Sequence, residues 1–177
     1  MVEWRPLWGF FPPTSDIEWK RVFELYMGSP EYIFKNNGMS LEEFKEIFFW
    51  EYFHRLWGRL IGIVFIIPML FFIILKKIPK PILSKLFIIL FLGGLQGFIG
   101  WWMVKSGLVN DPSVSQYRLT IHLSNALLIL SLLIWVYLEV KEGVSQIKLD
   151  FSFFMFSILF ITIIAGAFVA GMDAGLM

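Results

Sequence analysis

The sequence predicts an all-α integral membrane protein with four transmembrane helices and an external amphipathic segment at its N-terminus. Of its 177 residues, 58% are hydrophobic and only 16% are charged, and the mean hydropathy is +0.72, outside the range of ordinary soluble domains. Four apolar runs each approach or exceed the ~20 helical residues that cross a hydrocarbon core of roughly 30 Å. The runs cover residues 56–75, 82–104, 119–138 and 151–171.

The distribution of charge predicts how these helices are oriented. The first and third connections between spans are rich in lysine: Lys76, Lys77, Lys80, Lys85, Lys141 and Lys148. Only Lys105 and Arg118 flank the second connection. Because basic connections stay on the cytoplasmic or matrix side, both termini of this chain are expected on the periplasmic or intermembrane side. The net charge of +1 gives no indication of nucleic-acid binding.

Residues 1–50 are expected to lie outside the bilayer, and residues 51–177 to form the four-helix bundle. The external segment lacks the basic start, apolar core and cleavage site of a signal peptide. It is rich in aromatic residues that suit the lipid headgroup level, namely Trp4, Trp8, Phe10, Phe11, Trp19 and Trp50. We therefore expect it to lie on the membrane surface; the alternative is a solvated loop whose aromatic residues are incidental.

Two capping boxes predict the helices of this segment. Ser15 is followed three residues later by Glu18, and Ser40 by Glu43. The first box predicts a helix over residues 16–27, which a Gly-Ser-Pro sequence ends. The second predicts a helix that continues without a breaker into the first membrane span.

The start of the first span combines charge, a histidine and glycines. At 3.6 residues per turn, Glu51, His54 and Arg55 share one face of a helix. Gly58 and Gly62 continue the row of His54 in steps of four residues, so a strip without side chains lies below the imidazole. A large planar ligand could lie on this strip. Glu51 could instead form only an ion pair with Arg55, worth a few tenths of a kcal/mol when exposed.

The second and fourth spans carry small residues that suit helix packing. Gly93 and Gly97 form a small-xxx-small pair, for which packing is the commoner explanation and a ligand pocket the alternative. Gln96 lies beside them, and an amide at this depth requires a hydrogen-bond partner. Residues 165–175, at the end of the fourth span, predict a surface for another helix.

His54 and His122 are the two histidines of the chain, and the predicted topology places both at the outer ends of their spans. The chain has no cysteine, which excludes disulfides, thiolate metal sites and covalent haem attachment. Two imidazoles that face each other across a bundle are the usual way to hold haem iron without cysteine. Arg55, Arg59 and Arg118 lie near this level and could bind haem propionates, or could anchor the helices at the headgroups.

Several motifs occur in order along the chain, among them Glu-Tyr-Phe-His-Arg at 51–55 and Gly-Gly-Leu-Gln-Gly at 93–97. The others are at 2–6, 30–32, 38–45, 58–59, 100–104, 106–108, 115–119, 122–123 and 165–175. At these motifs the chain resembles the haem A synthases, membrane enzymes that oxidise a methyl group of haem O to the formyl group of haem A for cytochrome oxidase. The resemblance extends along nearly all of the chain.

This resemblance implies eight helices in two similar halves, each with a histidine pair near the outer face. The chain would then be part of a longer protein, with one helix before Met1 and three after Met177. His54 and His122 would face the substrate haem, Glu51 would act in the reaction, and the pair that would hold an auxiliary haem b has no counterpart here. The implied reaction is two successive hydroxylations of the methyl group followed by loss of water.

The resemblance also implies location and partners. The external segment resembles the mitochondrial and alphaproteobacterial branch more than the Gram-positive one, which implies the bacterial or mitochondrial inner membrane. The implied partners are haem O as substrate, an electron donor of unknown identity, haem O synthase, the assembly of cytochrome oxidase, membrane lipid and a second copy of the chain. Two alternatives stay open: a cytochrome b-like carrier whose histidines bind haem without catalysis, and a structural bundle or assembly factor without stoichiometric haem.

Overall fold

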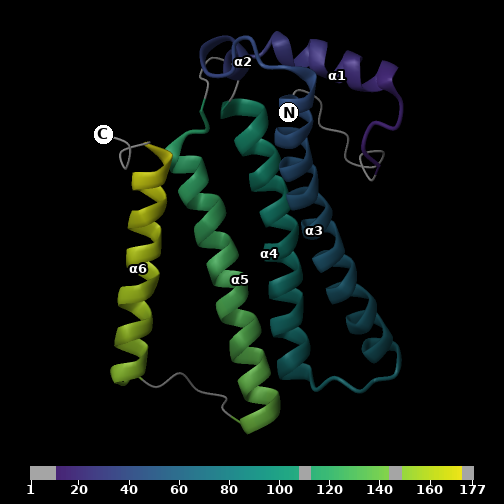
Figure 1. Ribbon diagram of the computed structural model, residues 1–177. Helices are drawn as coiled ribbons and strands as arrows, with labels where there is room; N and C mark the ends of the chain where they lie inside the picture. Colours follow the sequence, from purple (N-terminus) through teal and green to yellow (C-terminus); the bar gives the residue numbers. More distant parts are fainter. Residues whose placement is uncertain (1–10, 108–112, 144–148, 173–177) are drawn as a thin grey trace. The chain divides into compact units, whose positions relative to one another are not determined.

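The computed structural model describes residues 11–107, 113–143 and 149–172, and all regular secondary structure within these ranges is helical (Figure 1). The helices are α1 (Asp16–Met27), α2 (Pro30–Phe34), α3 (Leu41–Ile74), α4 (Lys80–Gly107), α5 (Gln116–Glu142) and α6 (Phe151–Gly171). The predicted all-α class is confirmed.

Helices α3 to α6 are each long and apolar enough to cross a membrane, and each contains one of the four predicted spans almost completely. Most of their large hydrophobic side chains are exposed, as expected of helices whose solvent is lipid. α3 continues through Pro68, which lacks the N–H that would bond to the preceding turn. As predicted, α3 runs without a break from Leu41 into the first span.

Capping boxes begin α1 and α3 where the sequence predicts them. At α1, the backbone N–H of Glu18 donates to Ser15 Oγ at 3.3 Å, and the Glu18 carboxylate accepts from the Thr14 backbone at 3.0 Å. Hydrogen bonds from the Thr14 and Ser15 backbone lower the pKa of Glu18. The predicted bounds of α1, residues 16–27, agree with the structure.

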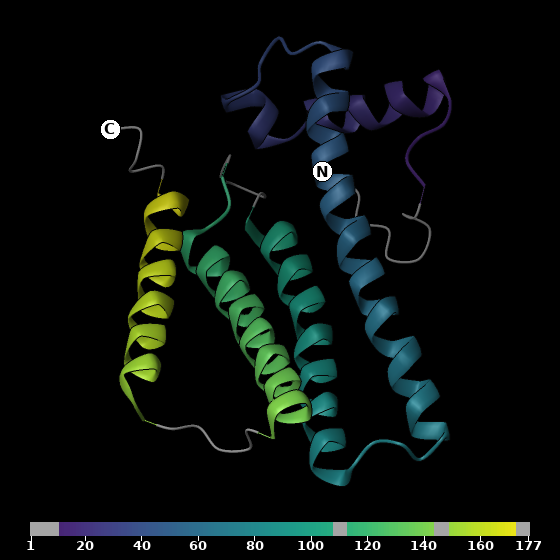
Figure 2. The same cartoon turned by 60° about the horizontal axis from the view of Figure 1, so that its bottom comes forward.

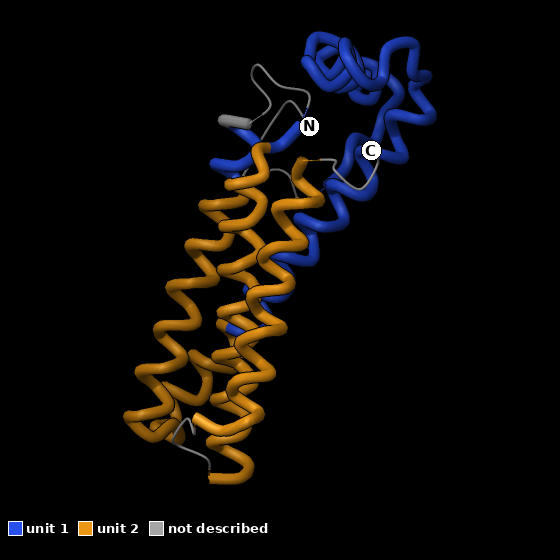
Figure 3. The backbone as a smooth tube through the Cα atoms, turned by 90° about the vertical axis from the view of Figure 1, so that its left-hand side faces the viewer, with its two compact units in different colours: residues 1–65, 101–114 blue, residues 66–100, 115–177 orange. Residues whose placement is uncertain are grey.

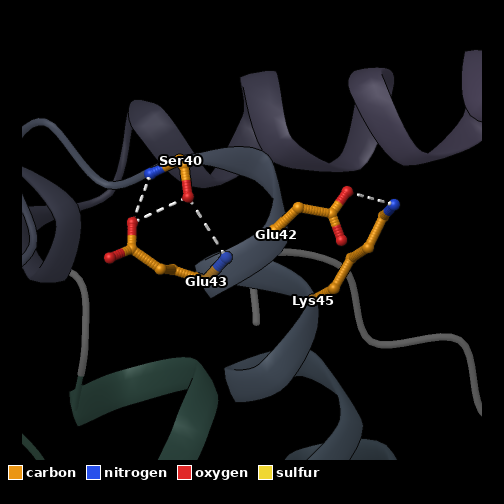
Figure 4. A network of polar contacts seen from close by, with 4 residues as sticks. All are labelled: Ser40, Glu42, Glu43 and Lys45. Carbon is orange, nitrogen blue, oxygen red and sulfur yellow. Dashed lines mark hydrogen bonds and ion pairs between the residues drawn. The ribbon is translucent and has the colours of Figure 1, made fainter.

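The box at α3 is closed in both directions (Figure 4). The backbone N–H of Glu43 donates to Ser40 Oγ at 3.3 Å, and the Glu43 carboxylate accepts from both the backbone N–H and the hydroxyl of Ser40, each at 2.8 Å. Lys45 and Glu42 form an ion pair at 2.8 Å on the neighbouring surface. The backbone N–H groups of Ser40 and Glu43 are thus satisfied before the helix enters its apolar part.

The short helix α2 was not predicted. Its start carries the usual signals, since Ser29 Oγ accepts from the Tyr32 N–H at 3.3 Å and Pro30 occupies the first helical position. The same Gly-Ser-Pro sequence that ends α1 therefore also begins α2. A cap followed directly by proline was the signal that could have revealed this helix.

The chain divides into two compact units, residues 1–65 with 101–114 and residues 66–100 with 115–177 (Figure 3). In the first unit, α1 and α2 pack against the beginning of α3 (Figure 2). Tyr26, Phe44 and Phe48 are buried at this junction. The Tyr26 and Phe44 ring centroids are 4.9 Å apart, and Trp19 meets Phe48 edge-on at 5.0 Å.

Of the aromatic residues expected at the headgroup level, Trp19 instead lies half-buried in this cluster. Phe11 and Trp50 are exposed, whereas Trp4, Trp8 and Phe10 lie outside the described residues. The amide of Asn36 donates to the Tyr26 hydroxyl at 2.6 Å and satisfies the polar atom that this core buries. The described part of the N-terminal segment is thus a small folded unit on the end of α3.

In the second unit, α5 packs against both α4 and α6. Tyr117 meets Phe168 edge-on at 5.7 Å, and a Cβ added to Gly171 would lie 2.7 Å from the Cα of Gln116, so α6 needs glycine there. At the other end of α5, Lys85 of α4 forms an ion pair with the mostly buried Glu139. The predicted small-residue surface of the fourth span therefore packs on α5 within its described part.

Candidate functional site

In the first unit, the candidate residues lie along one face of α3, as the sequence predicts. Arg55 Nη2 is 3.4 Å from Glu51 Oε2, and Arg55 Nε donates to the backbone oxygen of Glu51 at 3.2 Å. The side chains are 22% exposed for Arg55 and 37% exposed for Glu51. The ion pair within α3, one of the two interpretations of Glu51, is therefore present, and its carboxylate still reaches the surface.

Below this pair, α3 presents an open strip. His54 is exposed, and a Cβ built on Gly58 or Gly62 would meet no heavy atom of the described residues within 4 Å. Arg59, which is half-buried, lies one residue beyond Gly58. Among the described residues, the strip predicted below the imidazole is therefore uncovered at both glycines.

In the second unit, His122 of α5 lies in a polar cluster with two amide side chains. Gln96 Nε2 donates to the backbone oxygen of His122 at 3.1 Å and lies 3.3 Å from His122 Nε2. Gln96 Oε1 accepts from Asn125 Nδ2 at 2.7 Å, and the same amide group donates to the backbone oxygen of Leu92 at 3.1 Å. The partner that the sequence requires for Gln96 is thus a pair of residues on α5.

Gly100 completes the surroundings of His122. A Cβ added to this glycine would lie 3.1 Å from His122 Cε1, closer than ordinary van der Waals contact. At Gly93 and Gly97 an added Cβ would meet nothing within 4 Å among the described residues. The close approach of α4 to α5 therefore depends on Gly100, not on the glycine pair that the sequence singled out.

Two residues of this site were not predicted. Asn125 is 9% exposed and follows His122 by three residues, on the same face of α5. Asn125 could have been found in the sequence, because it is an amide on an apolar helix, one turn from a histidine. Gly100 gave no signal, because a glycine that receives an imidazole looks in sequence like any other glycine of that span.

The two histidines occupy different units: His54 belongs to the first and His122 to the second. Their pairing across a bundle stays a prediction, as do the propionate contacts of Arg55, Arg59 and Arg118. Arg118 is half-buried in the first turn of α5. His54 therefore stands at an exposed position, whereas His122 lies among amide side chains.

A model of the cytochrome oxidase assembly protein family matches residues 1–177, the whole of the chain. The chain belongs to this family. A curated relative from Nitrosospira multiformis, named "Heme A synthase", is 50% identical over 99% of this chain and 52% of its own length. Proteins of the same name from Parvibaculum lavamentivorans and Granulibacter bethesdensis are 42% and 45% identical, over 100% and 99% of this chain. No solved structure matches the chain.

This chain spans about half the length of the curated relatives that it matches. Membership of the cytochrome oxidase assembly protein family, together with four apolar helices, indicates an integral membrane protein. Within the described ranges, no group of three or more His, Cys, Asp or Glu side chains could hold a bare metal ion.

Proposed function

We propose that the protein to which this chain belongs oxidises the methyl group of haem O to the formyl group of haem A. The observation that carries this proposal is the match of the whole chain to relatives named haem A synthase, at 42–50% identity. The change from methyl to formyl removes electrons and hydrogen and adds oxygen. It therefore requires an oxidant and an oxygen source that act together with this chain. Where dioxygen is both, an electron donor must supply two electrons for each hydroxylation.

The residues present fit a haem substrate. A neutral imidazole is a good axial ligand, and His54 and His122 would hold the iron. His54 stands above the open strip of Gly58 and Gly62, and His122 fits against α4 because residue 100 is glycine. Haem supplies both the methyl group to be oxidised and the redox-active iron, and the chain supplies position, charge and proton transfer.

Glu51 is the residue that we assign to proton transfer. It shares a face of α3 with His54, and its carboxylate is only partly covered by Arg55. Arg55 would bind a haem propionate in place of Glu51 at small cost, because a partly exposed ion pair within one helix is worth only ~0.3–0.5 kcal/mol. Arg59 and Arg118 would bind propionates in the same way. The released Glu51 carboxylate then accepts a proton from the reacting group.

We further propose the setting of this reaction. The chain would lie in the inner membrane of a bacterium or mitochondrion, with both of its ends on the periplasmic or intermembrane side. Haem O synthase would supply the substrate, cytochrome oxidase assembly would receive the product, and haem b would occupy the other half of the protein. Gln96 and Gly97 would line the substrate pocket. A second copy of the chain is a further candidate partner.

The test is to express this chain in a host that makes haem O, purify it from the membrane and identify the extracted haem by chromatography and mass. We expect haem O or its oxidised forms, lost in His54→Ala and in His122→Ala. Tyr137→Phe, at an exposed position of α5, is the control and should keep the haem. If the chain purifies from the membrane without haem, the proposal fails for this chain.

Glu51→Gln separates the enzyme from the cytochrome b-like carrier. In the intact protein, the enzyme should retain haem O and lose the oxidised products, because the axial ligands are unchanged and the proton acceptor is gone. A carrier needs no carboxylate, so neither its spectrum nor its redox cycling would depend on this residue. Normal haem A yield from Glu51→Gln would contradict the role proposed for Glu51.

A further inference from the structure

We infer that Asn125 and Gln96 are positioning residues for His122, which fix the proton of its imidazole on Nδ1 and hold the unprotonated Nε2 toward the Gln96 amide. This inference concerns the chain alone, and only the identity of the ligand, haem iron, rests on the proposed function. It follows from four polar contacts between α4 and α5, taken in three steps.

The first step is the orientation of the Asn125 amide. Asn125 Nδ2 lies 3.1 Å from the backbone oxygen of Leu92. A backbone oxygen can only accept, so the Asn125 atom that faces it must be the NH₂ group. The reversed amide would bring two carbonyl oxygens together in a nearly buried position. The backbone of α4 therefore sets the direction of this amide.

The second step passes this direction to Gln96. The Asn125 NH₂ group also lies 2.7 Å from the Gln96 amide, so the Gln96 atom at that contact must be the acceptor, Oε1. Its NH₂ group then points the other way, toward His122. There it donates to the His122 backbone oxygen at 3.1 Å, which again only an NH₂ group can do.

The third step reaches the imidazole. Gln96 Nε2 lies 3.3 Å from His122 Nε2, and an amide nitrogen donates but does not accept. His122 Nε2 must therefore be the acceptor, and in the neutral ring the proton is on Nδ1. The backbone of α4 at Gly100 lies close to another side of the ring, since even an added Cβ would be 3.1 Å from Cε1. The imidazole is held in one orientation and one tautomer.

This tautomer suits a metal ligand. Histidines that bind metals commonly have a partner that fixes the tautomer and the ring orientation. Here a chain of amides achieves the same result from the Nε2 side, before a ligand arrives. Gln96 would have to move off Nε2 before a metal could bind there, and it could keep its bond to the His122 backbone oxygen.

The test is ¹⁵N NMR of the ligand-free chain with labelled histidine, at a pH where the rings are neutral. The chain has two histidines, and His54→Gln assigns the signals of His122. We expect a protonated Nδ1 and an unprotonated Nε2. In Gln96→Leu the two nitrogens should shift toward the opposite assignment, because the donor to Nε2 is lost. In Asn125→Leu the shift should be smaller, because the His122 backbone oxygen still holds the Gln96 NH₂ group. Gln96→Leu leaves the bond between Asn125 and Leu92 in place and guards against loss of folding.

Thr120→Val is the matched control. Thr120 is also buried on α5, but its hydroxyl donates within the helix to the Gln116 backbone oxygen at 2.7 Å. This variant should leave the His122 signals unchanged. A protonated Nε2 in the unsubstituted chain would overturn the inference, and so would a protonated Nδ1 that survives both leucine variants.

A second measurement separates this inference from the proposed function. In haem-loaded protein, Gln96→Leu and Asn125→Leu should lose part of the low-spin, six-coordinate spectrum at unchanged haem content, because the imidazole is no longer held in one tautomer and one orientation. The predicted tautomer in a chain that binds no haem would support the inference and contradict the proposed function. If the chain binds haem, but His122 Nε2 is protonated in its ligand-free form, the result would support the proposed function and contradict the inference.

Discussion

The absence of a Cβ at one glycine decides how closely α4 approaches His122. Of the described glycines of α4, Gly93, Gly94 and Gly97 have open space where a Cβ would stand, and Gly100 has an imidazole. Sequence could indicate that Gln96 needs a partner, because a buried amide without one is costly. It could not rank the glycines, because the space beside each depends on how two helices far apart in sequence meet.

Gly100→Ala is therefore expected to weaken haem binding through the position of His122. The added methyl group lies 3.1 Å from Cε1 and pushes the ring from its place beside Gln96. Changes next to metal-binding histidines typically cost about 10–100-fold in affinity. The measurement is haem titration of the purified protein, followed by its absorption spectrum.

Gly93→Ala is the control, on the same helix with nothing within 4 Å among the described residues. There the change should be neutral or slightly stabilising, since alanine favours a helix by ~1 kcal/mol over glycine. Equal haem affinity in the two variants would show that the close approach to Gly100 does not hold the imidazole.

Glu31 gives a prediction of pH dependence. Burial raises the pKa of this carboxyl on α2, and the nearby Glu51 carboxylate raises it further while Lys35 opposes the shift. The folded state therefore binds the proton more tightly than the unfolded state. Stability of the first unit should fall as pH rises from the ordinary glutamate pKa through the raised value, with the full penalty above it.

Glu31→Gln removes this penalty, so its thermal midpoint should exceed that of the parent at neutral pH. The two should agree in acid, where both carry a neutral side chain. Unfolding followed by near-ultraviolet circular dichroism, which reports the aromatic cluster, is the measurement. Glu24→Gln, at an exposed position of α1, is the control and should show no such pH-dependent gain.

Helices were predictable where local chemistry decides them. The capping boxes at Ser15 and Ser40 placed the starts of α1 and α3, and apolar length placed the four long helices. The beginning of α3 was not included in the first span because residues 41–55 mix charges with aromatic residues. Their packing against α1 and α2, which hydropathy cannot report, explains that mixture.

Phe44→Ala should release α1 and α2 from α3. Phe44 is 2% exposed between Tyr26 and Phe48, and truncation of a buried phenylalanine typically costs about 3–5 kcal/mol. α3 itself should remain helical, because its own hydrogen bonds are unaffected. Limited proteolysis of purified protein should then cut faster between α1 and α3, within residues 28–40.

Phe49→Ala is the matched control, because Phe49 lies on the same helix and is 52% exposed. Its cleavage rate should stay close to that of the parent. If both variants resist protease equally, the aromatic cluster does not hold the two short helices in place.

For the molecule as a whole, the orientation in the membrane is predicted most directly from the charges on the connections between helices. Lysines are enriched at the first and third connections, and Lys85 of α4 uses its charge to pair with Glu139 of α5. That pair lies at the lysine-rich end, whereas Gln96, His122 and Asn125 lie toward the opposite end of the same two helices. One helix pair thus carries a structural ion pair at one end and the candidate haem ligand at the other.

The orientation of these ends can be tested with single cysteines, because the chain contains none of its own. Lys77→Cys marks the first connection and Ser113→Cys the second. A thiol reagent that cannot cross the inner membrane should label Ser113→Cys from the periplasmic side and leave Lys77→Cys unlabelled, since lysine-rich connections remain in the cytoplasm. Permeabilised membranes, in which both positions should react, provide the control. The reverse pattern in sealed membranes would put His122 and its amide cluster toward the cytoplasmic face and would contradict the predicted orientation.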